Sequence, residues 1–127
     1  MYVGGYGGGV GGGGGGMKKI QAEIFEWSTR NFGELPNSQI PLRISSFLGM
    51  VEEVGELAHA VLKWSQGIRG TAEEHQAEVE DSIADLLVYT LDFCARNNMD
   101  AEMLLANVWA KVKLRDWKKN AATGVVE

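Results

Sequence analysis

The stretch LRISSFLGMVEEVGELAHAVLKWSQ, from Leu42 to Gln66, decides the fold of this chain. Its apolar residues recur every three or four positions, which is the spacing that one face of an α-helix requires. They are Ile44, Phe47, Leu48, Val51, Val54, Leu57, Val61 and Leu62. We therefore predict a single helix over the whole stretch, ended by the glycines at 67 and 70.

The remainder of the chain predicts three more helices and no strand. They cover about residues 18–30, 71–97 and 101–118, each with apolar residues at helical spacing. Thr71 and Glu74 have the spacing of a capping box, and Asp100 is a good N-cap residue. The predicted fold is all-α, a four-helix bundle built from helix hairpins.

Composition indicates one small domain. The chain has 127 residues, a formal net charge of -5 and 17 glycines, 11 of which lie in residues 1–16. A glycine tract buries too little apolar surface to offset the entropy of ordering it. We expect a disordered tail over residues 1–16, a folded domain over 17–120 and a frayed end over 121–127.

Charge and apolar content narrow the classes of partner. No apolar run has the length of a membrane span and no signal peptide is recognised, so we expect a cytoplasmic protein without a membrane partner. The acidic balance disfavours duplex nucleic acid, which binds basic surfaces. A core this small, with four tryptophans, favours a homodimer or homotetramer.

Carboxylates recur on the two longest predicted helices. On the first, Glu53 and Glu56 share one face and Glu52 lies about 100° away. On the second, Asp81 and Asp85 follow each other one turn apart. If the two helices pack antiparallel, Glu53, Glu56, Asp81 and Asp85 converge and need a cation between them. Oxygen ligands suit Mg²⁺, with Mn²⁺ as the alternative.

Two other interpretations of these acids stay open at this point. Acidic runs on helices are commonly solvated surfaces without a ligand. The Glu56-x-x-His59 pair is typical of di-iron carboxylate bundles, but such bundles need a second pair of this kind, and the sequence contains none.

A polar row on the last predicted helix has the chemistry of a phosphate site. Asn107, Lys111 and Arg115 are each four residues apart, so they form one stripe. Lys and Arg neutralise phosphate oxygens, although basic residues near a helix C-terminus are favourable without any ligand. Trp27, with Phe32 nearby, is our candidate for stacking on a nucleobase.

Three segments in this order resemble the MazG-like, all-α nucleoside triphosphate pyrophosphohydrolases. EEVGEL at Glu52 to Leu57 resembles their EExxE motif, and DSIADLLVY at Asp81 to Tyr89 resembles their second acidic helix. KVKLRDW at Lys111 to Trp117 is similar to a basic segment of the small members, and QAEIFEWSTRNFGE to their first helix. The resemblance covers nearly all of the chain after the glycine tract.

The resemblance implies a dimer or dimer of dimers that uses Mg²⁺ to cleave a nucleoside triphosphate to the monophosphate and pyrophosphate. Glu53 and Glu56 match the metal-binding glutamates and Asp85 the aspartate of the second motif. The family has glutamate where this chain has Ser82, so Asp81, or else Glu78, would replace it.

Within this implied mechanism, Glu52 or another carboxylate outside the metal shell accepts the proton of the attacking water. Lys111 and Arg115, with Asn107, hold the phosphates. A non-catalytic helical module that binds nucleotide or metal is the alternative, because of the departure at Ser82.

Overall fold

The computed structural model of the chain describes residues 16–33 and 42–127. It contains α1 (Gly16–Phe32), α2 (Leu42–Gln66), α3 (Ala72–Arg96) and α4 (Ala101–Val112), with no strand among the described residues. The predicted all-α class is therefore confirmed. The predicted glycine tail, apart from Gly16, and most of the turn between the first two helices lie outside the described residues.

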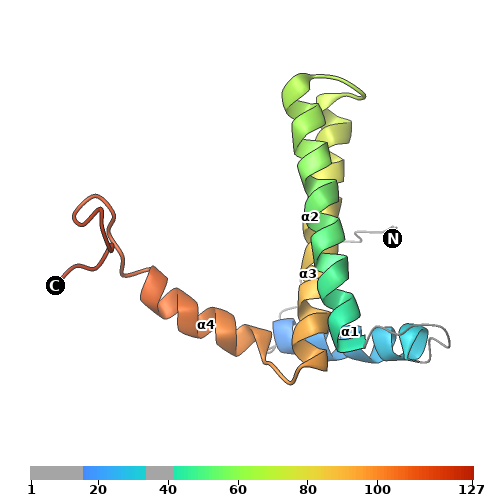
Figure 1. Cartoon of the computed structure of the whole chain (residues 1–127), viewed down its shortest axis with the longest axis horizontal. Coiled ribbons are helices and arrows are strands. Elements are labelled where there is room, and N and C mark those ends of the chain that lie inside the picture. The colour runs from blue at the N-terminus through green and yellow to red at the C-terminus, as the bar shows by residue number, and fades with distance from the viewer. Residues whose placement is uncertain (1–15, 34–41) are drawn as a thin grey trace.

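The two longest helices, α2 and α3, run antiparallel side by side as a hairpin (Figure 1). The turn between them includes Gly67 and Arg69, whose φ angles are 66° and 63°. The predicted capping box is present, because the Thr71 side chain accepts from the Glu74 amide while the Glu74 carboxylate accepts from the Thr71 amide. These local signals fix where α3 begins.

Helix α1 crosses the base of this hairpin and packs against α3 (Figure 1). Gln21 links it to the start of α4: its side chain donates to the Met99 carbonyl at 2.9 Å and accepts from the Ala101 amide at 3.1 Å. Lys18 forms an ion pair with Asp100 at 3.2 Å, and Asp100 caps α4 as predicted. Helix α1, helix α3 and the start of α4 thus meet at the base of the hairpin.

Helix α4 leaves this base and projects away from the hairpin as an arm (Figure 1). It ends at Val112, so the prediction that it continues to about Lys118 was wrong. Residues 113–127 turn back instead: the Asp116 amide donates to the Gly124 carbonyl at 2.7 Å, and the Asp116 carboxylate accepts from the amides of Lys118 and Lys119. Aspartate side chains that bond to nearby amides favour turns over helix.

Helix α2 packs on α3 through the side that carries Glu53, opposite to its apolar stripe. Its buried residues are Ser46, Gly49, Glu53 and Ala60, small or acidic side chains that share one face. The apolar stripe points outward, and Val51 and Val54 remain 55 % and 52 % exposed. Likewise Ile83 and Leu87, two apolar residues at helical spacing on α3, remain 45 % and 56 % exposed. The periodicity located the helices correctly but not the face that each one buries within a single chain.

Buried apolar side chains are few as a result. Among the described residues only Ala60 and Cys94 are both apolar and buried. No described helix combines the length and the apolar content that crossing a bilayer demands.

Candidate metal and nucleotide site

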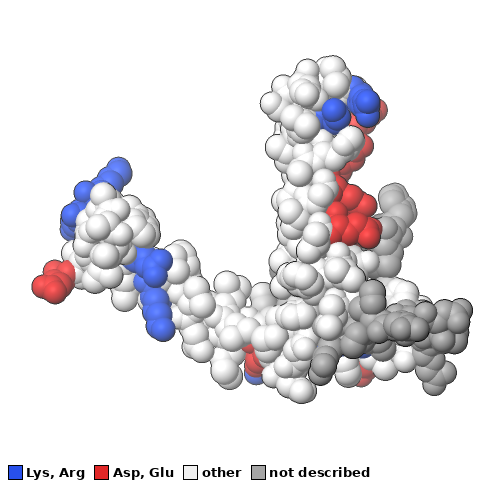
Figure 2. All heavy atoms as spheres, viewed as in Figure 1, with Lys and Arg blue, Asp and Glu red and all other residues white. Residues whose placement is uncertain are grey.

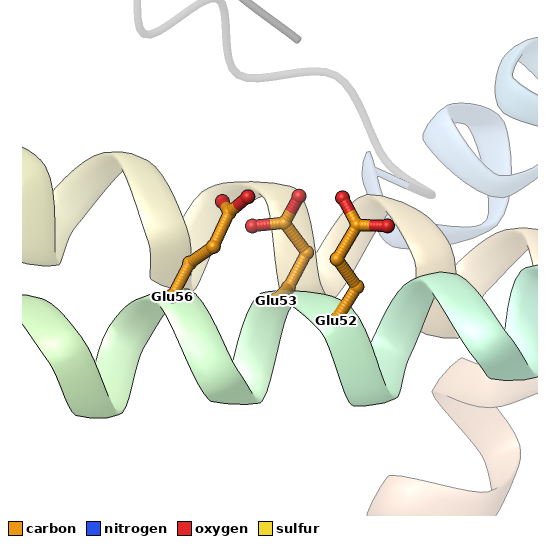
Figure 3. A group of neighbouring side chains, drawn as sticks. All are labelled: Glu52, Glu53 and Glu56. Atoms are coloured by element: carbon orange, nitrogen blue, oxygen red, sulfur yellow. The ribbon is translucent and has the colours of Figure 1, made fainter.

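Three glutamates of α2 form a row beside α3. Glu52, Glu53 and Glu56 extend to the same side of the helix (Figure 3). Each offers a carboxylate oxygen, and these oxygens lie within 4.8 Å of one another. The i, i+3 spacing of Glu53 and Glu56 brings their carboxylates together, as the sequence predicted.

Glu53 is the buried member of this row. Its side chain is only 3 % exposed, and its Oε2 atom has no hydrogen-bond partner among the described residues. Burial, followed by the carboxylates of Glu56 and Asp85, raises the pKa of Glu53 to about 7. A buried carboxylate without a partner is costly, and a bound cation would remove that cost.

Helix α3 carries Asp81 and Asp85, which are not among the residues whose oxygens lie within 4.8 Å of one another, but Asp85 interacts electrostatically with the glutamate row. Burial raises the pKa of Asp85, and the neighbouring charges of Asp81 and Glu56 raise it further. Asp85 therefore stands in the same electrostatic environment as the glutamate row. Glu78, the alternative to Asp81, is instead next to His75, with 4.0 Å between its carboxylate and the ring Nδ1.

The raised pKa of Glu53 predicts how stability depends on pH when metal is absent. The folded state holds the Glu53 proton more tightly than the unfolded chain, so this contribution is complete below the ordinary pKa of 4.5 and is lost as pH rises through about 7. Asp85 acts with the same sign. In EDTA we expect Tm to fall between about pH 5 and pH 8, and Glu53→Gln to flatten the fall. Equal slopes for the two proteins would contradict this assignment.

A cavity of about 260 Å³ adjoins the carboxylates. Glu52 and Asp85 line one part of it, and the aromatic rings of Trp27, Phe32 and Tyr89 line other parts. Trp27 and Phe32 pack edge to face, with 5.5 Å between ring centroids. Trp27, which we predicted to stack on a nucleobase, thus lines a cavity beside the carboxylates.

Gly49 allows the Tyr89 ring to approach α2. A Cβ atom at this position would lie 2.3 Å from Tyr89 Cε1, which no side chain could tolerate without displacing the ring. Burial, with the nearby charges of Glu52 and Glu53, raises the pKa of Tyr89. Its hydroxyl group therefore stays neutral near pH 7 and can donate a hydrogen bond.

A polar cluster in the same cavity was not predicted from the sequence. Ser28 Oγ donates to Asp92 Oδ1 at 2.5 Å, Arg96 Nε donates to Asp92 Oδ2 at 3.0 Å, and an Arg96 Nη2 group donates to Ser28 Oγ. Ser46 Oγ, also at the cavity, is buried and has no hydrogen-bond partner among the described residues. The Asp92/Arg96 spacing of four residues on one helix was the signal available for part of this cluster.

The structure does not bring the basic row to the carboxylates of the same chain. Asn107 and Lys111 lie on α4, and Arg115 follows it. In Figure 2 the Lys and Arg side chains of the arm are separated from the acidic patch on the hairpin by the base of the molecule. The role of Asn107, Lys111 and Arg115 in holding phosphates therefore stays a prediction.

Searches with protein-family models, against curated proteins and against solved structures returned no match to this chain.

Proposed function

We propose that this protein is a Mg²⁺-dependent nucleoside triphosphate pyrophosphohydrolase, which releases the monophosphate and pyrophosphate from an NTP or dNTP. The observation that supports this most is the buried Oε2 atom of Glu53, which has no hydrogen-bond partner among the described residues and belongs to a row of three glutamates. Glu52 of the same row lines the aromatic cavity. Such a donor set fits a hard cation. The resemblance of EEVGEL and DSIADLLVY to the MazG-like motifs points the same way.

In this proposal, different residues bind the metal, accept the proton of the attacking water and bind the base. Glu53, Glu56, Asp81 and Asp85 hold Mg²⁺, which when bound supplies positive charge for the phosphate oxygens and acidifies water. Glu52 accepts the proton of the attacking water, because its carboxylate adjoins the others but is exposed. Trp27 and Tyr89 flank the base in the cavity.

Oligomerisation belongs to the same proposal. The outward apolar faces of α2 and α3 fit a helical bundle that is completed by a second copy, in a homodimer or homotetramer. A nucleoside triphosphate substrate is consistent with a cytoplasmic location.

The test is pyrophosphate release from a panel of NTPs and dNTPs, with Mg²⁺ and with EDTA. We expect release from at least one member that requires Mg²⁺ and stops in EDTA. Release of orthophosphate alone would contradict cleavage between the α- and β-phosphates and indicate a different phosphohydrolase. No release from any member would contradict the enzyme and leave the non-catalytic nucleotide- or metal-binding module. Thermal melts with the same compounds would identify that module, because a ligand of the native state raises Tm.

Trp27→Ala is expected to weaken nucleotide binding without removing the metal site. Loss of a stacking surface costs about 1–3 kcal/mol per base, so KM should rise roughly tenfold or more. The Mg²⁺-induced increase in Tm should remain, since no carboxylate is altered. The control is Trp64→Ala, a tryptophan near the far end of α2. An unchanged KM in Trp27→Ala would show that the base does not bind in this cavity.

A further inference from the structure

Helix α4 carries an apolar face that the described residues of its own chain leave exposed. At 100° per residue, this face spans about 140° of the helix surface. It consists of Leu104, Leu105, Val108, Trp109 and Val112, whose exposed fractions range from 38 % to 58 %. The contacts of α4 with α1 are made around its first turn, through Asp100 and Ala101. An apolar face of this size on a projecting helix indicates an interaction surface.

The far end of the arm folds back on itself through hydrogen bonds of the Asn120 side chain. The Asn120 side chain donates to Thr123 Oγ1 at 2.8 Å and to the Val125 carbonyl at 3.1 Å, and accepts from the amides of Ala122 and Thr123. Arg115 lies over the Trp117 ring, 5.9 Å from its centroid. These contacts join the residues after α4 to one another and hold Arg115 against Trp117.

The hairpin offers the complementary surface. The outward face of α2 includes Leu48, Val51, Val54 and Leu62, each about half exposed. Residues 42–96 contain ten acidic and four basic residues, whereas residues 101–127 contain three acidic and five basic residues. Hairpin and arm are therefore opposite in charge as well as alike in apolar content.

The two surfaces also match in layout. On α2, Glu52 lies about 40° from Leu48, at the border of the outward apolar face. On α4, Lys111 lies about 20° from Leu104, at the border of its own apolar face. When the apolar faces meet, the charged borders of opposite sign can meet too, which favours this pairing over a like-charged one.

We propose that the arm of one copy packs on the hairpin of a second copy, and that the nucleotide site is shared between them. Lys111 and Arg115 of one copy then stand beside Glu52 and Glu56 of the partner subunit, where they neutralise substrate phosphates. Exchange of a projecting element between two identical chains is a common route to a dimer. The phosphate-binding role rests on the proposed function, whereas the exchanged arm does not.

The first test measures the mass of the full-length protein in solution by light scattering. We expect at least twice the chain mass of 13.8 kDa. Leu105→Glu with Trp109→Glu should weaken assembly by at least about a hundredfold, since central aromatic residues dominate interface energy. Ala110→Glu, roughly opposite on the helix, is the matched control and should leave the mass unchanged. A monomeric wild type, or a double variant that assembles normally, would overturn the proposal.

The second test asks which chain supplies the cations, and it needs no activity. Two differently tagged chains, one with Lys111→Cys and one with Glu52→Cys, both with Cys94→Ala, are mixed and treated with a short bis-maleimide. We expect a covalent product that carries both tags. A chain with both cysteines that links only to itself, or an absence of any mixed product, would overturn the exchange.

If the panel shows turnover, mixing provides an independent check on the shared site. Glu53→Gln and the double variant Lys111→Ala, Arg115→Ala should each be inactive alone. In a random mixture of twofold dimers, about a quarter of the sites combine both intact halves, so about a quarter of the wild-type rate should return. No recovery, with the mixed cross-link present, would reject the shared phosphate role and keep the exchanged arm.

Discussion

Replacing Glu53 by glutamine is expected to abolish Mg²⁺-dependent pyrophosphate release while the helices persist. Residues that only support metal ligands cost up to about a hundredfold when replaced, so loss of a ligand should cost at least that much. The metal-free variant should be as stable as the wild type or more so, because an unpartnered buried charge is removed. Steady-state rates and thermal melts in EDTA measure the two effects.

The control for Glu53→Gln is Glu23→Gln, an exposed glutamate on α1. It makes the same chemical change away from the carboxylate row and should leave both rate and Tm unchanged. Glu56→Gln should reduce the rate as Glu53→Gln does, since both are assigned as ligands. Full activity in either ligand variant would end the metal assignment.

Replacing Arg96 by methionine is expected to destabilise the protein strongly. Arg96 and Asp92 form an ion pair at 3.0 Å, and their side chains are only 8 % and 10 % exposed. Removing one partner leaves an uncompensated buried charge, which typically costs about 3–5 kcal/mol. Urea unfolding measures the loss, and the protein concentration is fixed because the proposed assembly would also contribute to stability.

The double variant Arg96→Met with Asp92→Leu separates the ion pair from simple packing. With both charges gone, only the neutral Ser28 hydroxyl group loses its hydrogen-bond partners, and replacement of a buried ion pair by apolar residues is often nearly neutral. We therefore expect the double variant to recover most of the lost stability. A double variant as unstable as Arg96→Met alone would show that the shape of the arginine, which also lies over the Phe25 ring, matters more than its charge.

The sequence predicted the helices well because the signals that define them are local. The bounds of α2 were predicted to the residue, and the caps at Thr71 and Asp100 are present. The early end of α4 was missed, because Asp116 stops it through bonds to Lys118 and Lys119 that compete with a continuing helix. The spacing of apolar residues does not reveal hydrogen bonds between a side chain and nearby backbone amides, so it cannot predict a turn of this kind.

The sequence predicted the carboxylate row but not the surroundings of the site. Glu53 and Glu56 are neighbours because of helix geometry alone, so their proximity follows from spacing. Ser46 and the Ser28–Asp92–Arg96 cluster come from three helices, and only tertiary packing brings them to one cavity. The position of Lys111 depends on the direction in which the arm leaves the hairpin, which no local pattern encodes.

Exposure of the predicted apolar stripe has a physical reason. Helix α2 has two sides, and the side that carries small residues makes the close contact with α3. There Gly49 leaves room for the Tyr89 ring. The larger apolar side then stays exposed in one copy of the chain. Helical periodicity identifies the apolar stripe of a helix but not the surface that would cover it.

The most direct test of the metal site is a titration of the metal-free protein with Mn²⁺, followed by the EPR signal of the free ion. We expect wild type to remove at least one Mn²⁺ per chain from the free signal, Mg²⁺ to release it, and Glu53→Gln to bind far less. Equal binding by wild type and Glu53→Gln, or no binding by either, would contradict a cation at the buried carboxylate.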